Sequence, residues 1–540
     1  MTITIDDEHL TIEDVVRVAR NHEKVKLSEK AKKKVEASRR IVEKKIEKKE
    51  RIYGHTTGVG GFRDVFLKPE LLELFQTNLI TSHSSGVGDP FPEDIVRATT
   101  SIRINQLARG YSGVSIDVIN KYGEMLNNRI YPYVPSQGSL ASSGDLCQLA
   151  PIAAVAIGLG RAFYKGKVVS GKVAMEKAGV EIYKLKPGEA LHLINGASAT
   201  CAMGALLVYD IERALKLDQI ATAMSLEALA ANPSPFKKGL HEARPHEGQL
   251  KSSKNIRKLI RGSEIIYRKR NKGEEEVQDP YSVRTYPQII SGPLENIKRA
   301  RNFIEKEMNS TSDNPVVLPD GSIISGGNFQ GQQLGGILDS LKHDIAVLSG
   351  EAERRINILN TFWMSNKFEG KRLPPYLTKD EGLSSGFMMP AYTAAGLAAE
   401  NMFLANPAST LSIPVSEGRE DYNAMASISG LYARKMLENL RYINAIELVC
   451  AAQGIHFRLE KNNPKLGKGT STAYHTFIKY TPYVHSDKSL RESNYEIETM
   501  PQIGVNLSVK PYDMSILLEV SRYASDHVLD AVERVVKLEI

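Results

Sequence analysis

Apolar residues recur three and four positions apart along much of the chain, which is the spacing of one face of an α-helix. The clearest run extends from Ile337 to Leu348 and predicts a long helix over about 333–359. A second run of the same kind predicts a helix over about 424–454. Helices of this length favour a bundle whose apolar core is shared between subunits.

The N-terminal part of the chain contains two further helical segments after a short predicted strand at Thr2–Ile5. Thr11 followed by Asp14 has the spacing of a capping box, so a helix with one apolar face is expected to begin here. From 28 to 51 lysine and glutamate dominate, which predicts a solvated helix with a thin buried stripe. We therefore interpret the lysine run as an exposed helix face.

Glycine-rich clusters separate the helical segments, and loops of this kind often carry catalytic residues. The clusters lie at 53–61, 84–88, 138–144, 195–204 and 325–336.

The overall pattern predicts a mainly α protein with small β elements in the N-terminal region and around 316–325. We expect two domains. One covers 1–200 and contains the first glycine-rich loops, and the other covers 201–540 with the central long-helix bundle and a C-terminal helical region. The polar segment 252–276 is expected to form an exposed loop between helices.

The composition argues against a nucleic-acid-binding protein, a metal-binding or disulfide-linked protein and a membrane protein. The chain has 540 residues, of which 42% are apolar, and its formal charge is only +7. Its 70 basic residues are interleaved with 63 acidic ones, so no single-sign field favours nucleic-acid binding. Neither the three cysteines, Cys147, Cys201 and Cys450, nor the histidines have metal-ligand or disulfide spacing. Without a signal-peptide pattern or an apolar stretch of about 20 residues, we expect a cytoplasmic protein with no metal and no membrane contact.

The segment 138–146 reads GSLASSGDL, and its small side chains leave the backbone free to bend sharply. If the amide nitrogen of Gly144 attacks the carbonyl carbon of Ser142, a five-membered ring closes, and loss of water from Ser143 leaves an electrophilic methylene group. On these residues alone, a glycine-serine turn before an apolar helix, with Asp145 in its first turn, is the simpler interpretation.

Eight motifs that follow one another along the chain resemble those of the histidine, phenylalanine and tyrosine ammonia-lyase family. They are IYGHTTGVG (52–60), LITSHSSG (79–86), GSLASSGDL (138–146), LING (193–196), ARPHEGQ (243–249), VQDPYSVR (277–284), DNP (313–315) and SGGNF (325–329). The likeness runs from about Ile12 to at least Gln453.

The resemblance implies a long-helix bundle of the ammonia-lyase and fumarase type. It also implies a 4-methylidene-imidazol-5-one (MIO) electrophile formed from Ser142, Ser143 and Gly144, with no diffusible cofactor. A homotetramer whose active sites combine loops from three subunits is a further implication.

Two departures from the family pattern lie in or beside this segment. The family usually has alanine where this chain has Ser142, and Cys147-Gln-Leu-Ala-Pro151 stands where Ala-Pro-Leu-Ala-His is common. Ring closure uses only the carbonyl of residue 142, so the MIO group is still expected to form.

Residues in the matching motifs take their expected roles from the family. Tyr53 is similar to the base for the β-proton or its activator, and Arg284 resembles the clamp for the substrate carboxylate, assisted by Gln278. Asn195 and Tyr281 resemble residues that hold the electrophile or the amino group. Without the motif context, Tyr53 would be interpreted as a residue of the hydrophobic core and Arg284 as one partner of a structural salt bridge.

The substrate side chain is expected to lie near Phe329, His83 and Glu420. Phe329 resembles a family residue beside the electrophile, and the Ser82-His83 pair is similar to histidine lyases, although some tyrosine aminomutases share it. Arg419-Glu420-Asp421 resembles the Gln-Glu-Asp of histidine lyases, where the other enzymes typically have Asn-Gln-Asp. Glu420 can accept a hydrogen bond from an imidazole N–H, or it can be a carboxylate at the start of the following helix.

The expected function is non-oxidative elimination of ammonia from L-histidine to give trans-urocanate. Gln330 and Tyr422 stand against it, because both replace residues that are commonly histidine. The alternative is a tyrosine or phenylalanine ammonia-lyase, or a 2,3-aminomutase, that uses the same MIO group.

Two interpretations lie outside this family. The segment from Ser384 to Pro390 resembles the catalytic serine loop of the fumarase and argininosuccinate lyase superfamily, but it lacks the lysine and asparagine that follow in those enzymes. A non-enzymatic helical scaffold is suggested by the lysine-rich 28–51 segment, but it leaves the catalytic motifs unexplained.

Overall fold

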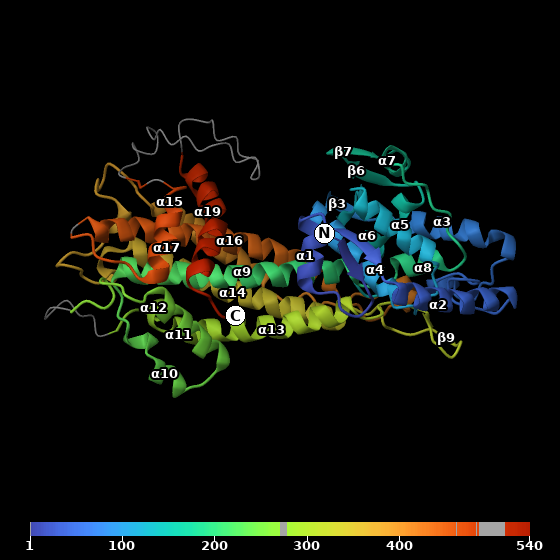
Figure 1. Ribbon diagram of the computed structural model, residues 1–540, viewed down its shortest axis with the longest axis horizontal. Coiled ribbons are helices and arrows are strands. Elements are labelled where there is room, and N and C mark those ends of the chain that lie inside the picture. Colours follow the sequence, from blue (N-terminus) through green and yellow to red (C-terminus); the bar gives the residue numbers. More distant parts are fainter. Residues whose placement is uncertain (1, 270–277, 461, 482, 485–512) are drawn as a thin grey trace. The chain divides into compact units, whose positions relative to one another are not determined.

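The computed structural model describes residues 2–269, 278–460, 462–481, 483–484 and 513–540. The chain forms two compact units. Unit 1 comprises Met1–Tyr209, Arg299–Ser340 and Pro407–Arg434, and unit 2 comprises Asp210–Lys298, Leu341–Asn406 and Lys435–Ile540. The chain passes between the units once in the segment at Asn406–Pro407 and otherwise within four long helices (Figure 1): α9 (Ser198–Leu229), α13 (Tyr286–Met308), α14 (Gln332–Asn360) and α16 (Ala426–Leu459).

Unit 1 contains the small β elements and most of the shorter helices. Its helices are α1 (Ile12–Arg20), α2 (Glu29–Glu47), α3 (Leu72–His83), α4 (Glu93–Ala108), α5 (Ile116–Asn127), α6 (Leu146–Ala156), α7 (Gly171–Ala178) and α8 (Glu189–Ile194). Its strands are β1 (Thr2–Ile5), β2 (Lys24–Leu27), β3 (Val87–Pro90), β4 (Tyr131–Pro132), β5 (Pro135–Gln137), β6 (Arg161–Tyr164), β7 (Lys167–Ser170), β8 (Val316–Val317) and β9 (Ile323–Ile324).

These strands form four small sheets and no large one among the described residues. Strands β1 and β2 pair in parallel, with Ile3 opposite Val25. Strands β4, β6 and β7 form an antiparallel sheet, while β3 pairs with β5 and β8 pairs with β9. The prediction of a mainly α protein with small β elements in the N-terminal region and around 316–325 is confirmed.

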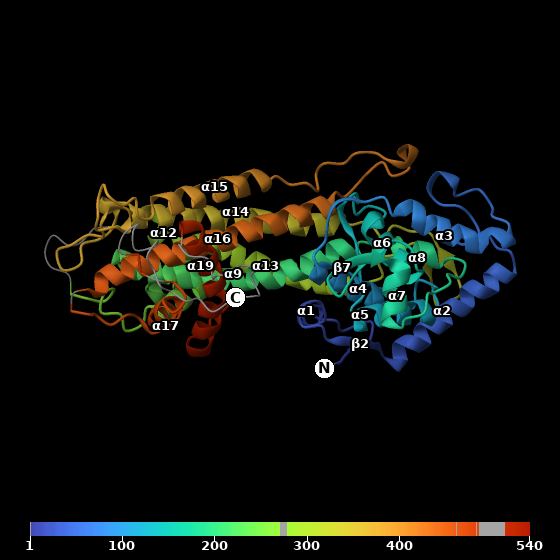
Figure 2. The same cartoon turned by 90° about the horizontal axis from the view of Figure 1, so that it is seen from above.

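Helix α4 forms the centre of the unit 1 core. Every residue from Ile95 to Ala108 is buried, and helices α1 and α5 pack against it. Helices α3, α6 and α8 pack against one another in the same unit (Figures 1 and 2). That packing matters for the site, because α3 ends at His83, α6 begins just after the Ser142-Ser143-Gly144 segment, and α8 ends beside Asn195.

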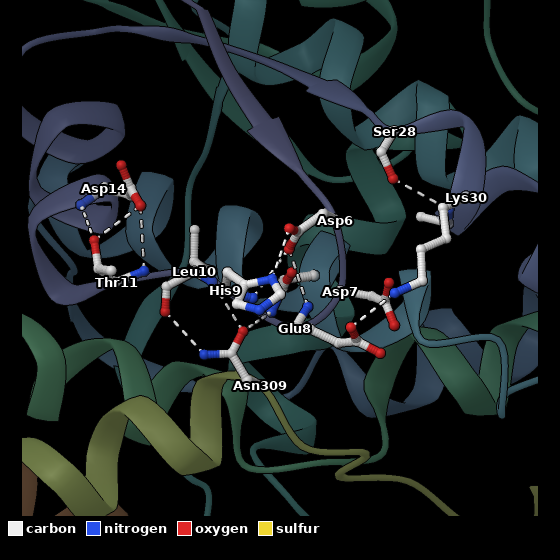
Figure 3. Close-up of polar contacts among 12 residues, drawn as sticks. Asp6, Asp7, Glu8, His9, Leu10, Thr11, Asp14, Ser28, Lys30 and Asn309 are labelled. Atoms are coloured by element: carbon white, nitrogen blue, oxygen red, sulfur yellow. Dashed lines mark hydrogen bonds and ion pairs between the residues drawn. The ribbon is translucent and has the colours of Figure 1, made fainter.

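The start of helix α1 is determined by the capping box that the sequence predicts. Figure 3 shows the capping box in which Thr11 accepts a hydrogen bond from the backbone N–H of Asp14 while the Asp14 carboxylate accepts from the backbone N–H of Thr11. The side chain of Asn309 accepts a hydrogen bond from the Leu10 N–H (3.0 Å) and donates to its carbonyl (2.8 Å). The predicted start of this helix is confirmed, and its entry is held by a residue far away in the sequence.

Unit 2 contains further helices beside the parts of the four long ones. They are α10 (Lys238–Glu242), α11 (Glu247–Leu259), α12 (Tyr281–Arg284), α15 (Met388–Leu404), α17 (Lys468–Phe477) and α19 (Met514–Val535). The expectation of an exposed loop over 252–276 is wrong for its first part, because α11 extends to Leu259 and buries Ser252, Ser253 and Asn255. The prediction failed because small polar residues, rather than apolar ones, occupy much of the buried face of α11, so the apolar periodicity of a helix is interrupted there. Residues 270–276 of the predicted loop lie outside the described residues.

Short 3₁₀ turns complete the described chain. They are η1 (Gly60–Phe62), η2 (Pro69–Leu71), η3 (Ser234–Phe236), η4 (Phe362–Met364), η5 (Pro375–Leu377) and η6 (Ser416–Gly418). None of the helices in the described ranges combines the length and the apolar composition that crossing a membrane requires.

The core of unit 2 is organised around a fully buried arginine on α14. The Arg355 guanidinium donates to Glu447 on α16 (2.6 Å) and to Asp218 on α9 (3.0 Å). Asp218 also accepts a hydrogen bond from Tyr286 on α13 (2.5 Å), so the four long helices meet at this cluster. Because all four side chains are buried, each depends on its partners to replace lost solvation.

We predict that Arg355→Met lowers the free energy of unfolding by about 3–5 kcal/mol, because it leaves two buried carboxylates without a cation. Chemical denaturation of the purified protein measures this change. Arg354→Met is the matched control: it is the preceding residue on α14, its side chain is 63% exposed, and its pairing with Glu353 is expected to contribute less than about 1 kcal/mol. Equal stability of the two variants would contradict the assigned role of Arg355.

Candidate active site

Unit 1 encloses a cavity of about 630 Å³. Five of the residues singled out from the sequence line it: Tyr53, His83, Ser143, Asn195 and Glu420. The other lining residues are Gly58, Val59, Gly60, Gly61, Phe62, Val65, Leu67, Phe75, Asn78, Leu79, Ser82, Leu146, Leu191 and Ser416. The cavity is therefore largely apolar with a few polar groups, as is usual for a site that binds a small molecule.

Tyr53 lies in the glycine-rich turn that follows α2. The hydroxyl of Thr56 holds this turn by donating to the Glu50 carbonyl and accepting from the Ile52 N–H, both at 2.8 Å. The backbone N–H of Gly60 donates to the phenol oxygen of Tyr53 (3.0 Å). A phenolate is the form of tyrosine that can accept a proton, and a donor aimed at the phenol oxygen stabilises that form.

The Ser142-Ser143-Gly144 segment is held against the turn after α8 by direct backbone contact. Gly144 has a φ of +95°, and a Cβ atom there would lie 2.1 Å from the backbone nitrogen of Gly196. The Asp145 N–H donates to the Gly196 carbonyl (2.8 Å). Only glycine fits at position 144, so its amide nitrogen is free of side-chain obstruction.

Asp145 fixes the far end of the same segment. It precedes α6, as expected, but its side chain does not cap that helix. Its two oxygens instead accept hydrogen bonds from the N–H and the hydroxyl of Thr200 in the first turn of α9, both at 2.7 Å. Burial raises the pKa of Asp145 to about 6, and the Thr200 donors oppose that rise. The carboxylate thus joins the serine-glycine segment to α9.

Ser142, which departs from the family pattern, has a structural role outside the proposed ring atoms. Its hydroxyl accepts a hydrogen bond from the backbone N–H of Ala424 (2.8 Å). The neighbouring Ala141 carbonyl accepts from the Gly331 N–H (2.9 Å), and Ala141 packs with Ala424 and Ala426. The serine side chain therefore anchors the segment to the loop before α16.

Asn195 follows the last turn of α8 and presents an unpaired acceptor. Its side-chain oxygen is buried and has no hydrogen-bond partner within the described part of the chain. Its backbone carbonyl accepts from Arg103 (2.7 Å), which also donates to the carbonyls of His192 and Ser312. Sequence reasoning missed Arg103, although an arginine inside the buried helix α4 was a detectable signal.

His83 and Glu420 lie on the part of the cavity where the substrate side chain is expected. The Nδ1 of His83 hydrogen-bonds to the Leu79 carbonyl (2.9 Å). Burial lowers the pKa of His83, and the nearby Glu420 carboxylate opposes that shift. Helix α16 begins at Ala426, so Glu420 is not in its first turn, and the interpretation as a helix-start carboxylate is not supported.

The remaining candidate residues do not line this cavity. Gln278, Tyr281 and Arg284 belong to unit 2, where Tyr281 is 70% exposed and the Arg284 guanidinium lies over its ring at 4.7 Å. Arg284 pairs with no carboxylate among the described residues. Phe329 is half-buried in unit 1, next to residues that line a separate, polar cavity.

In the described residues, no group of three or more histidine, cysteine or acidic side chains is placed to hold a metal ion. The three cysteines are all free thiols.

Comparison with known proteins agrees with this architecture. A family model described as aromatic amino acid lyase matches residues 10–479. A histidine ammonia-lyase from Streptococcus sanguinis is 42% identical over 488 residues, which cover 90% of this chain and 93% of that protein. Among solved structures, tyrosine aminomutase from Streptomyces globisporus matches with a TM-score of 0.89 and 30% identity over all of both chains. Histidine ammonia-lyase from Trypanosoma cruzi matches with a TM-score of 0.85 and 30% identity, over 99% of this chain and 95% of that one.

The helical fold and the tyrosine, serine-glycine and asparagine loops around one cavity define an amino acid lyase. The chain belongs to the aromatic amino acid lyase family.

Proposed function

We propose that this protein is a histidine ammonia-lyase, which eliminates ammonia from L-histidine to give trans-urocanate. The observation that carries the proposal is that Glu420 and His83 line the same cavity as Ser143 and Tyr53. A carboxylate can accept a hydrogen bond from the imidazole N–H of the substrate more strongly than a neutral amide can. The 42% identity to a histidine ammonia-lyase over most of both chains supports this choice of substrate.

The Ser142-Ser143-Gly144 segment fits the MIO group of the family. The close backbone approach at Gly144 leaves no room for a side chain, and the Ser143 side chain lines the cavity. The hydroxyl of Ser142 bonds to Ala424 and is not needed for ring closure. When formed, the group supplies an electrophile that turns the substrate amine into a leaving group.

The residues of the chain supply the remaining functions. Tyr53 accepts the β-proton of the substrate as a phenolate, and the Gly60 N–H donates to this oxygen and stabilises the phenolate form. The unpaired Asn195 oxygen can accept a hydrogen bond from the ammonium group of the substrate. Glu420 holds the imidazole ring. A clamp for the substrate carboxylate is still needed, and Arg284 is the best candidate.

We infer that other subunits of a homotetramer supply Gln278, Tyr281, Arg284 and Phe329 to each site. Helix α15 supports an assembly, because it buries only the stripe formed by Pro390, Ala394, Ala398 and Asn401. Its other faces expose the large apolar side chains of Met389, Tyr392, Met402 and Phe403. Exposed apolar area of this kind marks a surface that binds another protein, and a second copy of the chain is the simplest partner.

The activity is tested by incubating the purified protein with L-histidine and following urocanate by its absorbance. We expect turnover, together with an intact mass two water molecules below that of the unmodified chain. Ser143→Ala should lack the two-water deficit and have no activity, because it cannot lose the water that leaves the methylene group. Formation of cinnamate, coumarate or a β-amino acid from another substrate, without urocanate from histidine, would replace the histidine assignment.

Glu420→Gln is predicted to lower kcat/KM for L-histidine by about 10- to 100-fold, the range expected for losing one charge-assisted hydrogen bond. The matched control is Glu417→Gln, three residues earlier in the same turn, whose exposed side chain does not line the cavity. Steady-state kinetics measure both variants. If the Glu420 variant kept the wild-type value, Glu420 would not bind the imidazole.

The shared site is tested by mixing inactive variants during refolding or co-expression. Ser143→Ala and Arg284→Met are expected to regain part of the activity, because hybrid tetramers would contain some sites with both native residues. Ser143→Ala and Tyr53→Phe are the control pair. Since both of their residues line one cavity in a single chain, no hybrid site contains both native residues. Equal failure of the two mixtures would exclude a site shared in this way.

A further inference from the structure

A buried chain of polar contacts lies behind the Tyr53 turn. The Nδ1 of His55 is 3.0 Å from the Tyr53 carbonyl oxygen, and its Nε2 is 3.3 Å from the Nε2 of His192. The Nδ1 of His192 is 2.9 Å from a carboxylate oxygen of Asp313. The two histidines are fully buried and Asp313 is almost so. Residues far apart in the sequence, on the Tyr53 turn, α8 and the segment before β8, therefore form one continuous path.

The hydrogen-bond partners determine where the protons lie. A carbonyl oxygen only accepts, so Nδ1 of His55 must carry a hydrogen. Burial, together with the neighbouring His192, lowers the pKa of His55 to about 3, so its ring is neutral and its Nε2 is an acceptor. The Nε2 of His192 must then donate to it. One more proton lies between the Nδ1 of His192 and Asp313.

The surroundings favour this arrangement. Asp313 also accepts hydrogen bonds from the Ser112 hydroxyl and from the Asn314 N–H (2.8 Å), so each of its two carboxylate oxygens has a donor. The other charged groups nearby are Arg103, 3.6 Å from Asp313, and Arg39, whose charge acts on His55.

The His55 ring also packs closely against neighbouring backbone. A Cβ atom at Gly188 would lie 2.1 Å from this ring, so the backbone just before α8 is in tight contact with it.

The two histidines of the path lie next to two residues that line the cavity, Asn195 and Tyr53. His192 and Asn195 are one turn apart at the end of α8, and Arg103 donates to both of their carbonyls. At the other end of the path, His55 donates to the carbonyl of Tyr53, the residue whose phenol lines the cavity. The path therefore links the position of the tyrosine to that of the asparagine.

We propose that His55 and His192 are positioning residues, and that the path from Asp313 through His192 and His55 holds Tyr53 in place relative to Asn195. The proposal rests on the function proposed above, in which Tyr53 takes the β-proton. Neither histidine lines the cavity, so neither acts on the substrate directly. Their effect is on kcat, because a shift of about 1 Å in a catalytic group can cost about 100-fold in rate.

The test compares two replacements of His55 that separate hydrogen bonding from packing. His55→Phe keeps an aromatic ring but cannot donate to the Tyr53 carbonyl, whereas His55→Asn is smaller but keeps a donor near the position of Nδ1. We expect kcat to fall by about 10- to 100-fold in the phenylalanine variant and clearly less in the asparagine variant, with KM for L-histidine within about threefold of wild type. A role in packing alone predicts the opposite order, and that result would overturn the proposal.

His241→Phe is the matched control. His241 is also buried and hydrogen-bonds through Nε2 to a backbone carbonyl, that of Pro235 (2.9 Å), on helix α10 of unit 2. Its replacement removes a similar bond, and we expect an unchanged kcat. Intact mass is measured for every variant. A two-water deficit shows that the electrophile has formed. If the wild type lacks this deficit or forms no urocanate, the proposed function is wrong. If the wild type is active but the His55 variants do not follow the expected order, only the proposal about the path is wrong.

Neutron diffraction from crystals of the active enzyme gives a readout independent of turnover. We expect deuterium on Nδ1 of His55 and on Nε2 of His192, with one more between Nδ1 of His192 and Asp313. A His55 ring without deuterium on Nδ1 would overturn the proposal, because that nitrogen could not then hold the Tyr53 carbonyl.

Discussion

The backbone of Gly144 lies against the backbone of Gly196 with no space for a Cβ atom between them. This contact joins the serine-glycine segment before α6 to the turn between α8 and α9, and the Asp145–Thr200 hydrogen bonds hold it closed. A segment that is packed this tightly has few accessible conformations, and an internal ring closure between backbone atoms requires such restriction. Ser143, which directly precedes this contact, lines the cavity together with Tyr53, Asn195 and Glu420.

Both units place an arginine at the centre of their polar core, but the two arginines have different partners. Arg355 in unit 2 faces carboxylates on separate helices, whereas Arg103 in unit 1 donates to three backbone carbonyls at the ends of local elements. The first arrangement fixes helices relative to one another. The second fixes irregular backbone, including the turn that carries Asn195. A guanidinium suits both tasks, because its donors spread in one plane toward several acceptors.

The sequence was sufficient to predict two of the four long helices and the first elements of the N-terminal region. The long helices predicted over 333–359 and 424–454 occur as Gln332–Asn360 and Ala426–Leu459, because apolar periodicity is a local property of the chain. The extra turn at the end of α16 and the helix α11 escaped detection, since their buried faces include polar side chains such as Arg458 and Asn255.

The candidate site was predictable only where motifs carried it. Motif resemblance selected Tyr53, Ser143, Asn195 and other residues that line one cavity, but it could not show which candidate residues lie outside that cavity. It also gave no reason to connect His55 with His192, which are 137 positions apart in the sequence. Such pairs form only when the tertiary fold brings buried polar groups together, so no periodicity or spacing in the sequence predicts them.

The hydroxyl of Ser142 satisfies a backbone N–H in the loop that also carries Glu420. The loop with Glu420 and the Ser142-Ser143-Gly144 segment are therefore not independent modules that could be exchanged separately. If a chimaera takes this loop from a relative with alanine at position 142, the loop comes from a protein in which no hydroxyl at position 142 accepts from its backbone N–H. Residue 142 and the stretch from 420 to 424 should accordingly be transferred together when substrate preference is redesigned.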